Sequence, residues 1–268
     1  MPIFFYSNPL LVKLLLDPLF ENQESGQFPL AYAMHDLGAN YSRVIRHPTT
    51  DGQYMPLEEC GNMIITTLAY TQRTQRTQDV AHLSQHYSIL KQWTGYLVQE
   101  ALIPANQLST DDFRGQLANQ TNLTLKGIIA IKAMSVITQK MGNTADEVHQ
   151  LAVVLSANPP HTNLSYGDDS SHGLWPLLSR TTSDIDLGTL YNLYADDLLG
   201  LNLVPQRIYD MQSAFYPTVA QTYGVPLDGM FSQNVLTLPI SRHFLTPLPS
   251  KTNTDFRKQR TGKSGQQQ

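Results

Sequence analysis

Apolar residues recur at helical spacing along most of the chain. Residues 9–24 place leucines at positions 11, 14, 15 and 19, a spacing that favours one face of a helix. Pro9 suits the first turn of that helix, and Gly26 follows its end. A second helix is predicted to open at Pro56. Similar patterns predict further helices at residues 80–101, 121–141, 144–157, 190–201 and 205–223.

No stretch shows the sustained alternation of apolar and polar residues that is typical of strands. The pattern therefore predicts an all-α protein built from helical hairpins. Two segments depart from it. Residues 175–189 add no recognisable element. Residues 229–268 are rich in Pro, Ser, Thr and Gln and hold six Lys or Arg against one acid, which predicts a disordered basic tail. This tail lacks the aromatic or helical pattern of a nucleic-acid arm, so no nucleic-acid partner is predicted.

Composition is that of one ordinary globular domain. The 268 residues are 41% hydrophobic with a net charge of -4. Cys60 is the only cysteine, which excludes an intrachain disulfide, and we expect a buried, inert thiol. The apolar N-terminus has no basic region or cleavage site, and Lys13 and Asp17 interrupt it, so neither a signal peptide nor a membrane span is predicted.

Four long blocks, at residues 4–41, 55–72, 120–135 and 190–228, resemble the fungal glutaminase A family. They include MPLEECGNMIITTLAYTQ and QTNLTLKGIIAIKAMS, and the resemblance is collinear from about Phe4 to Asp228. It implies an (α/α)6 toroid of six helical hairpins and hydrolysis of L-glutamine to L-glutamate and ammonia. It also implies an extracellular, glycosylated protein. Four Asn-X-Ser/Thr sequons are compatible with glycosylation.

The resemblance is also incomplete. A closed toroid of six hairpins needs twelve helices, whereas the pattern predicts seven or eight. We therefore interpret residues 1–228 as a partial hairpin domain from the C-terminal part of a larger protein, with an N-terminal β-rich region missing here. The family pattern stops after Asp228, and residues 175–189 interrupt it. Both departures resemble gene-model errors.

Candidate chemistry gathers between Tyr32 and Met63. His35 and Asp36 lie in a long loop, and Glu58 and Glu59 lie in the first turn after Pro56. Loops and helix starts at one end of a toroid line its pocket, so we predict Asp36, Glu58 and Glu59 as catalytic and His35 and Asn62 as substrate-binding. Adjacent helical residues point about 100° apart, so only one of the two glutamates is expected to face the pocket. The competing interpretation is a helix cap and a turn.

A second polar cluster lies at residues 191–197, where Tyr194 and Asp196 are predicted on the substrate side. The alternative there is an ordinary amphipathic helix. His161 and His172 flank Asp168 and Asp169 without helical i, i+4 spacing, so no metal site is predicted. No nucleotide or phosphate motif appears and no cofactor is expected. Two rival functions remain open: a carbohydrate-active toroid using paired carboxylates, and an inactive helical remnant.

Overall fold

The computed structural model describes residues 9–38, 54–74, 77–109, 115–143, 191–220, 222, 225–226 and 237–238. These residues form six helices: α2 (Pro9–Glu24), α3 (Pro56–Thr74), α4 (Thr77–Glu100), α5 (Thr121–Lys140), α8 (Leu193–Leu199) and α9 (Gln206–Val219). Two-residue strands β1 (Val225–Pro226) and β2 (Thr237–Leu238) pair antiparallel. The all-α prediction is confirmed. None of the described helices combines the length and apolar run needed to cross a bilayer.

The helix boundaries follow the sequence signals. Pro9 and Pro56 each open a helix, and α2 ends at Glu24, just before Gly26, which has a φ of 79°. The predicted helix at 144–157, the segment 175–189 and His161, His172 and their acids lie outside the described residues. Most of the predicted basic tail does too, although β2 lies inside it and pairs with β1.

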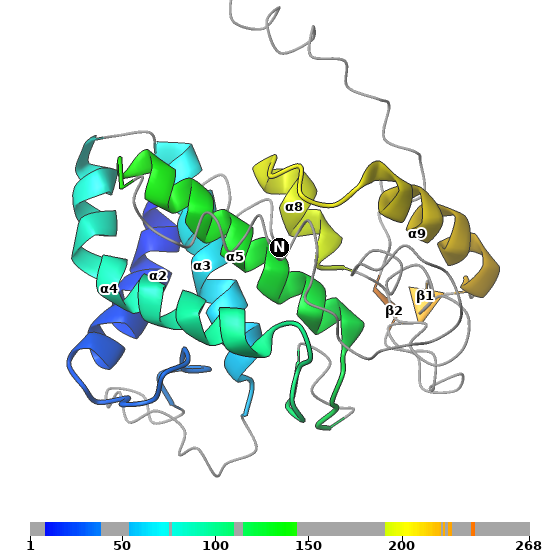
Figure 1. Cartoon of the computed structure of the whole chain (residues 1–268), viewed down its shortest axis with the longest axis horizontal. Helices are drawn as coiled ribbons and strands as arrows, with labels where there is room; N and C mark the ends of the chain where they lie inside the picture. The colour runs from blue at the N-terminus through cyan, green and yellow to red at the C-terminus, as the bar shows by residue number, and fades with distance from the viewer. Residues whose placement is uncertain are drawn as a thin grey trace, which may run out of the picture.

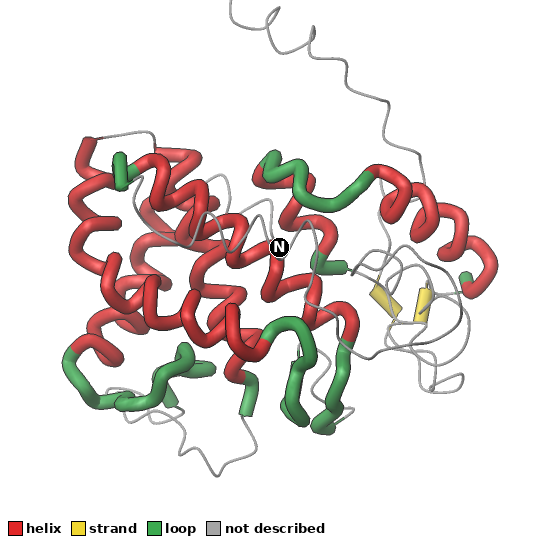
Figure 2. Tube along the Cα trace, viewed as in Figure 1, coloured by secondary structure: helices red, strands yellow, loops and turns green. Residues whose placement is uncertain are grey.

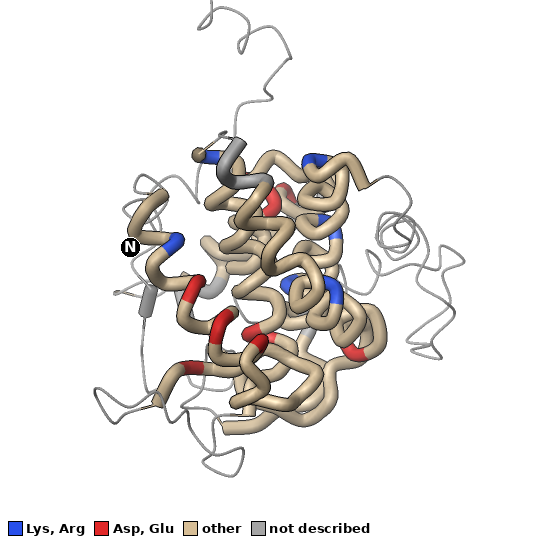
Figure 3. The backbone as a smooth tube through the Cα atoms, turned by 90° about the vertical axis from the view of Figure 1, so that its left-hand side faces the viewer, with Lys and Arg blue, Asp and Glu red and all other residues tan. Residues whose placement is uncertain are grey.

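Helix α5 is the centre of the bundle. It runs between α3 and α4 on one side and α8 on the other (Figure 1). This is the position of a central helix. Val136 is partly buried, and the other apolar residues of α5 point in every direction rather than along one stripe and are all buried. They are Leu123, Leu125, Ile128, Ile129, Ala130, Ile131, Ala133, Met134 and Ile137. Charged positions are sparse along the described helices (Figure 3).

Helix α2 packs on α3 and α4 through one apolar face, because Val12, Leu16 and Phe20 are four residues apart and all buried. Gln23 continues this face with a polar tether. Its Nε2 donates to the carbonyls of Leu30 and Tyr32, at 2.8 and 2.9 Å, and its Oε1 accepts from Trp93 Nε1 of α4 at 3.1 Å. The loop after α2 is therefore drawn against α4.

Two described loops meet at one end of the bundle, beside the start of α3. They are the loop after α2 and the connection between α4 and α5 (Figure 2). The second loop caps α3, because Gln107 Oε1 accepts the backbone N–H of Leu57 at 2.9 Å. The N–H of Leu108 also donates to the carbonyl of Tyr54 at 2.9 Å. These bonds fix the first turn of α3, which carries Glu58 and Glu59.

A glycine sets how closely α5 approaches the end of α4. A Cβ on Gly127 would lie 2.4 Å from Cβ of Ala101 and 3.4 Å from Cδ2 of Leu57, which is too close to Ala101 for two carbons. Gly127→Ala is therefore expected to lower the free energy of unfolding by about 1–3 kcal/mol, measured by urea denaturation. Gly95→Ala in α4 is the control, because a Cβ there meets nothing within 4 Å. Equal stabilisation of both variants by the gain in helix propensity would contradict this packing.

Candidate functional site

The site is organised by a buried ion pair between α3 and α5. Lys126 Nζ lies against Glu58 Oε1, and the two side chains are only 7% and 2% exposed. The lysine stem crosses α3 at Gly61, where a Cβ would lie 2.6 Å from Cγ of Lys126. Gly61 therefore makes room for the ion pair, and the pair aligns the first turn of α3 with the second turn of α5.

The ammonium group also orients an amide. Lys126 Nζ donates to Asn62 Oδ1 at 2.8 Å. Because an ammonium only donates, the Asn62 oxygen must face it, and the amide nitrogen is turned the other way. That nitrogen donates to Glu59 Oε2 at 3.2 Å. Glu58, Lys126, Asn62 and Glu59 thus form one continuous chain of polar contacts, which we call the relay.

The far end of the relay is an acid with an unusual proton affinity. Burial raises the pKa of Glu59 from 4.5 to about 7, and the negative charge of Glu58 adds to the rise. The hydrogen bond from Asn62 and the charges of His35 and Lys126 act in the opposite direction but do not cancel it. Glu59 therefore exchanges its proton near neutral pH, as a general acid or base must.

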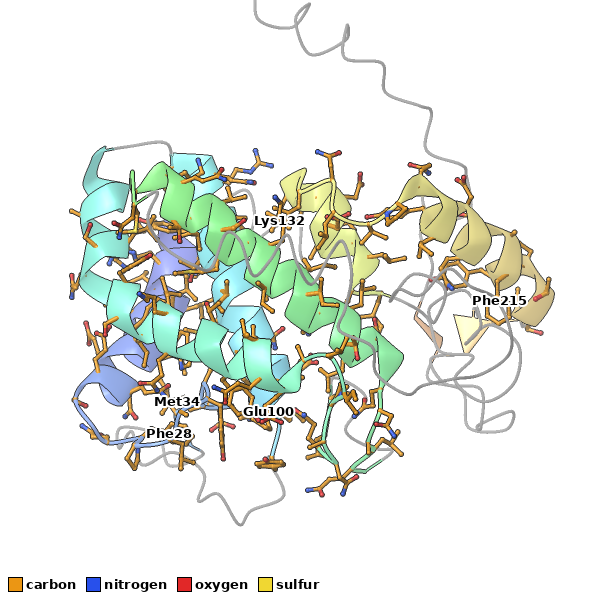
Figure 4. The ribbon with its side chains drawn as sticks, in the orientation of Figure 1. Phe28, Met34, Glu100, Lys132 and Phe215 are labelled. Carbon is orange, nitrogen blue, oxygen red and sulfur yellow. The ribbon has the colours of Figure 1, made fainter. Side chains whose placement is uncertain are left out.

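The loop after α2 brings a second pair of groups to the same place. The N–H of Ala33 donates to Cys60 Sγ at 3.2 Å, which anchors the loop on α3. Two residues later, His35 Nδ1 lies 2.6 Å from Asp36 Oδ2, and the other oxygen of Asp36 accepts the N–H of Gly38 at 2.6 Å. Both side chains are about one-third exposed, so they form the open side of the site. Figure 4 shows Met34 at the same end of the bundle as Glu100.

Cys60 itself is buried and free, as predicted from the sequence. Burial raises the pKa of its thiol well above the usual range, although the Ala33 N–H acts against the rise. The thiol therefore stays protonated and unreactive, and its part in the site is to hold the loop.

The structure brings together five of the predicted site residues: His35, Asp36, Glu58, Glu59 and Asn62. It also separates the two glutamates, because Glu58 is committed to Lys126 while Glu59 is the partly exposed acid of raised pKa. This separation follows from their positions on adjacent sides of the helix. The assignment of catalytic roles to them stays a prediction.

Asp196 makes a set of structural hydrogen bonds. It is 2% exposed, and its two oxygens accept the N–H groups of Leu203 and Val204, at 3.0 and 3.1 Å. The hydroxyl of Tyr209 donates to it as well, at 2.7 Å. All these donors belong to the segment that joins α8 to α9 or to α9 itself, so Asp196 holds this connection. Its place on the substrate side stays a prediction. Tyr194, partly exposed on α8, stays a prediction.

Lys126 and Gly61 were not among the residues predicted from the sequence. The sequence did contain a signal for Lys126. It is the only charged residue in LTLKGIIAI, and all the remaining residues of that stretch are apolar or small. A charge in such a place needs a buried partner. The identity of that partner depends on how α3 and α5 align, and a periodic pattern does not contain that information.

Fold and site together define an all-α helical-hairpin domain with a buried ionic relay at the loop end of its bundle. Residues 1–237 match the family model described as "Glutaminase A six helical-hairpin domain". The chain belongs to this family, as its sequence motifs predicted. The match extends past residue 228, where we expected the hairpin domain to end.

Two curated relatives support the same placement. Glutaminase A of Aspergillus oryzae is 53% identical over 240 residues, which cover 85% of this chain and 32% of the relative. A protein of Arthroderma benhamiae named probable glutaminase is 32% identical over 318 aligned positions, which cover 85% of this chain and 35% of the relative. The chain therefore spans about a third of the length of these relatives. The second alignment is longer than the chain itself, so that relative has segments with no counterpart here.

The raised pKa of Glu59 predicts a pH-dependent stability. Between about pH 4.5 and 7 the folded state binds a proton that the unfolded chain has released, so the free energy of unfolding falls as pH rises. The fall is expected to reach at most about 3 kcal/mol. Glu59→Gln should remove it, whereas Glu21→Gln, on an exposed part of α2, should keep it. Urea unfolding at pH 5 and pH 8 measures the difference, and parallel behaviour of both variants would contradict the raised pKa.

The ion pair predicts a second stability effect. Lys126→Met leaves Glu58 buried without its cation and is expected to lower the free energy of unfolding by about 3–5 kcal/mol. Adding Glu58→Gln should restore most of that loss, because no buried charge then remains. A denaturant series on the single and double variants tests this coupling. A double variant as unstable as the sum of both single variants would argue against a direct pair.

Proposed function

We propose that this chain supplies the hairpin-domain part of a glutaminase, which hydrolyses the side-chain carboxamide of L-glutamine to L-glutamate and ammonia. The observation that carries the proposal is Glu59, a partly buried acid with a pKa of about 7 at the end of an ordered relay. The family membership and the names of the relatives support the same reaction. The proposal includes secretion of the protein, because the resemblance to this family implies an extracellular location.

Glu59 has the properties that amide hydrolysis requires of a proton carrier. Its carboxylate accepts a proton from water as the oxygen attacks the carboxamide carbon. It then gives that proton to the nitrogen as the carbon–nitrogen bond breaks and ammonia leaves. A pKa near 7 serves both steps at neutral pH, since the group is neither too weak a base nor too weak an acid.

The rest of the relay holds this acid in position. Lys126 fixes the orientation of Asn62, and Asn62 fixes one oxygen of Glu59. Glu58 neutralises the lysine, which limits how far the cation lowers the pKa of Glu59. His35 carries a hydrogen on Nδ1, because Asp36 only accepts, and its Nε2 is then the ring nitrogen turned away from Asp36. We assign His35 and Asp36 to polarising or orienting the substrate.

The relay removes Glu58 from the carboxyl groups that a carbohydrate-active site could use. Glycoside hydrolysis uses two carboxyl groups with separate roles on either side of one bond. Glu58 is occupied by Lys126 and almost fully buried, so it does not form such a pair with Glu59. The inactive-remnant alternative asks whether a chain of this length is active, which the geometry of the site does not decide. The comparison of the chain with a hybrid enzyme, described below, addresses it.

The activity prediction concerns Glu59. We expect Glu59→Gln to lower kcat for ammonia release from L-glutamine by about 10²–10⁴-fold, because the amide neither accepts nor releases the proton. Glu21→Gln, far along α2 and exposed, should leave kcat unchanged. The variants are compared in the 268-residue chain and in Aspergillus oryzae glutaminase A carrying this chain in place of its matching segment.

The two backgrounds separate the possible outcomes. Activity in the hybrid but not in the chain alone means that the site is right and the chain needs the remainder of the protein. Activity that survives Glu59→Gln in the hybrid would overturn the assignment of Glu59. A hybrid that folds, as judged by circular dichroism, and yet releases no ammonia would favour the inactive remnant.

A further inference from the structure

A second cluster of ionisable groups lies between α2 and α4, outside the relay. His82 and His86 are four residues apart on α4 and therefore share one face of the helix, and Asp17 of α2 lies opposite them. Each of the three offers a ligand atom, and these atoms lie within 4.8 Å of one another. The two imidazoles are only 8% and 2% exposed.

Contacts around the cluster hold both rings in place. His82 Nε2 lies 2.7 Å from Asp17 Oδ1. His86 Nδ1 lies 2.9 and 3.0 Å from the two oxygens of Glu24. Phe20 stacks on His86 with ring centroids 4.4 Å apart and an interplanar angle of 11°. The two histidine rings meet edge to face at 4.7 Å. The rings are therefore pre-oriented rather than free to rotate.

The hydrogen bonding of the cluster is incomplete. His82 Nδ1 is buried, and no hydrogen-bond partner is found for it among the described residues. A buried ring nitrogen without a partner is costly, and such groups in a folded protein call for an explanation. His86 directs Nδ1 to a carboxylate, which leaves Nε2 as the nitrogen available to a ligand. A carboxylate behind a histidine is the usual outer partner of a metal-bound imidazole.

We propose that Asp17, His82 and His86 bind one divalent first-row transition-metal ion of the Zn²⁺ type, with Glu24 supporting His86 from behind. Two imidazoles and a carboxylate suit such ions rather than Mg²⁺ or Ca²⁺, which prefer oxygen ligands. Ligand atoms lie about 2.0–2.2 Å from zinc, so two of them are at most about 4.4 Å apart. The present separations need only a small rotation of the side chains.

The proposed ligand set has one competing cation. Lys13 pairs with Asp17 Oδ2 and is the cation that a metal ion must displace or tolerate.

A metal ion at this place would join α2 to α4 with coordinate bonds. In Figure 3 the helix that starts at the N label carries one basic position followed by acidic ones, and α2 accordingly contains Lys13, Asp17, Glu21 and Glu24. Two of these acids, Asp17 and Glu24, reach α4 through its histidines. The ion would therefore rigidify α2 just before the loop that carries His35 and Asp36.

Zinc titration of the full 268-residue chain tests the proposal. The chain is stripped with a chelator, and ZnCl₂ is titrated in competition with a chromophoric chelator. One zinc ion per chain is expected. His86→Gln and Asp17→Asn should each weaken binding by more than about 100-fold, and Glu24→Gln by about 10–100-fold. Lys13→Met should strengthen it. His35→Gln, which removes an imidazole outside the cluster, is the control and should bind as the unaltered chain does.

Circular dichroism establishes whether each variant is folded. If a ligand variant does not fold, Glu24→Gln and Lys13→Met, which leave the three ligands in place, still decide the test. Co²⁺ gives an independent readout, since a bound ion with nitrogen and oxygen ligands shows visible d–d absorption that the ligand variants should lose. No zinc binding in the micromolar range would overturn the proposal. Binding that falls equally in His35→Gln and His86→Gln would overturn it too, because it would then be non-specific.

Discussion

The site depends on one buried ion pair, Glu58 with Lys126. A lysine and a glutamate removed from water are costly to bury, and good geometry between them offsets part of that cost. Gly61 provides the geometry by letting the lysine stem cross α3 without a side chain in the way. Asn62 provides a further partner for the ammonium. The pair therefore fixes the alignment of α3 on α5, and that alignment in turn places Glu59.

The same pair separates the roles of two neighbouring acids. Glu58 and Glu59 are adjacent in sequence, yet Glu58 is committed to Lys126 in a buried contact while Glu59 has a pKa of about 7. Two identical groups have been driven apart by what surrounds them, which is the usual origin of distinct acid and base functions in an active site. A helix makes this possible, because consecutive residues point into different environments.

The helices were predictable because their signals are local. Pro9 and Pro56 mark helix starts without reference to any other part of the chain. The face predicted for α2 was wrong, because Leu14 and Leu15 are exposed and the buried face is Val12, Leu16 and Phe20. The relay was predictable except for its lysine. Local spacing and family resemblance indicated Glu58, Glu59, Asn62 and His35, but Lys126 comes from 68 positions later. The pattern also did not show that Asp196, predicted on the substrate side, is buried and accepts hydrogen bonds from the segment that follows its helix.

Helix α2 connects the two polar regions of the described bundle. Its middle and end reach α4 through Asp17, Glu24 and Gln23, and each contact is polar within an otherwise apolar interface. Polar contacts of this kind are directional, so they define the rotation and depth of α2 more sharply than Val12, Leu16 and Phe20 do. Gln23 also donates to the carbonyls of Leu30 and Tyr32, so the position of α2 determines the position of the loop that follows it. The position of His35 beside Glu59 is thus set from both sides, by α2 through Gln23 and by α3 through Cys60.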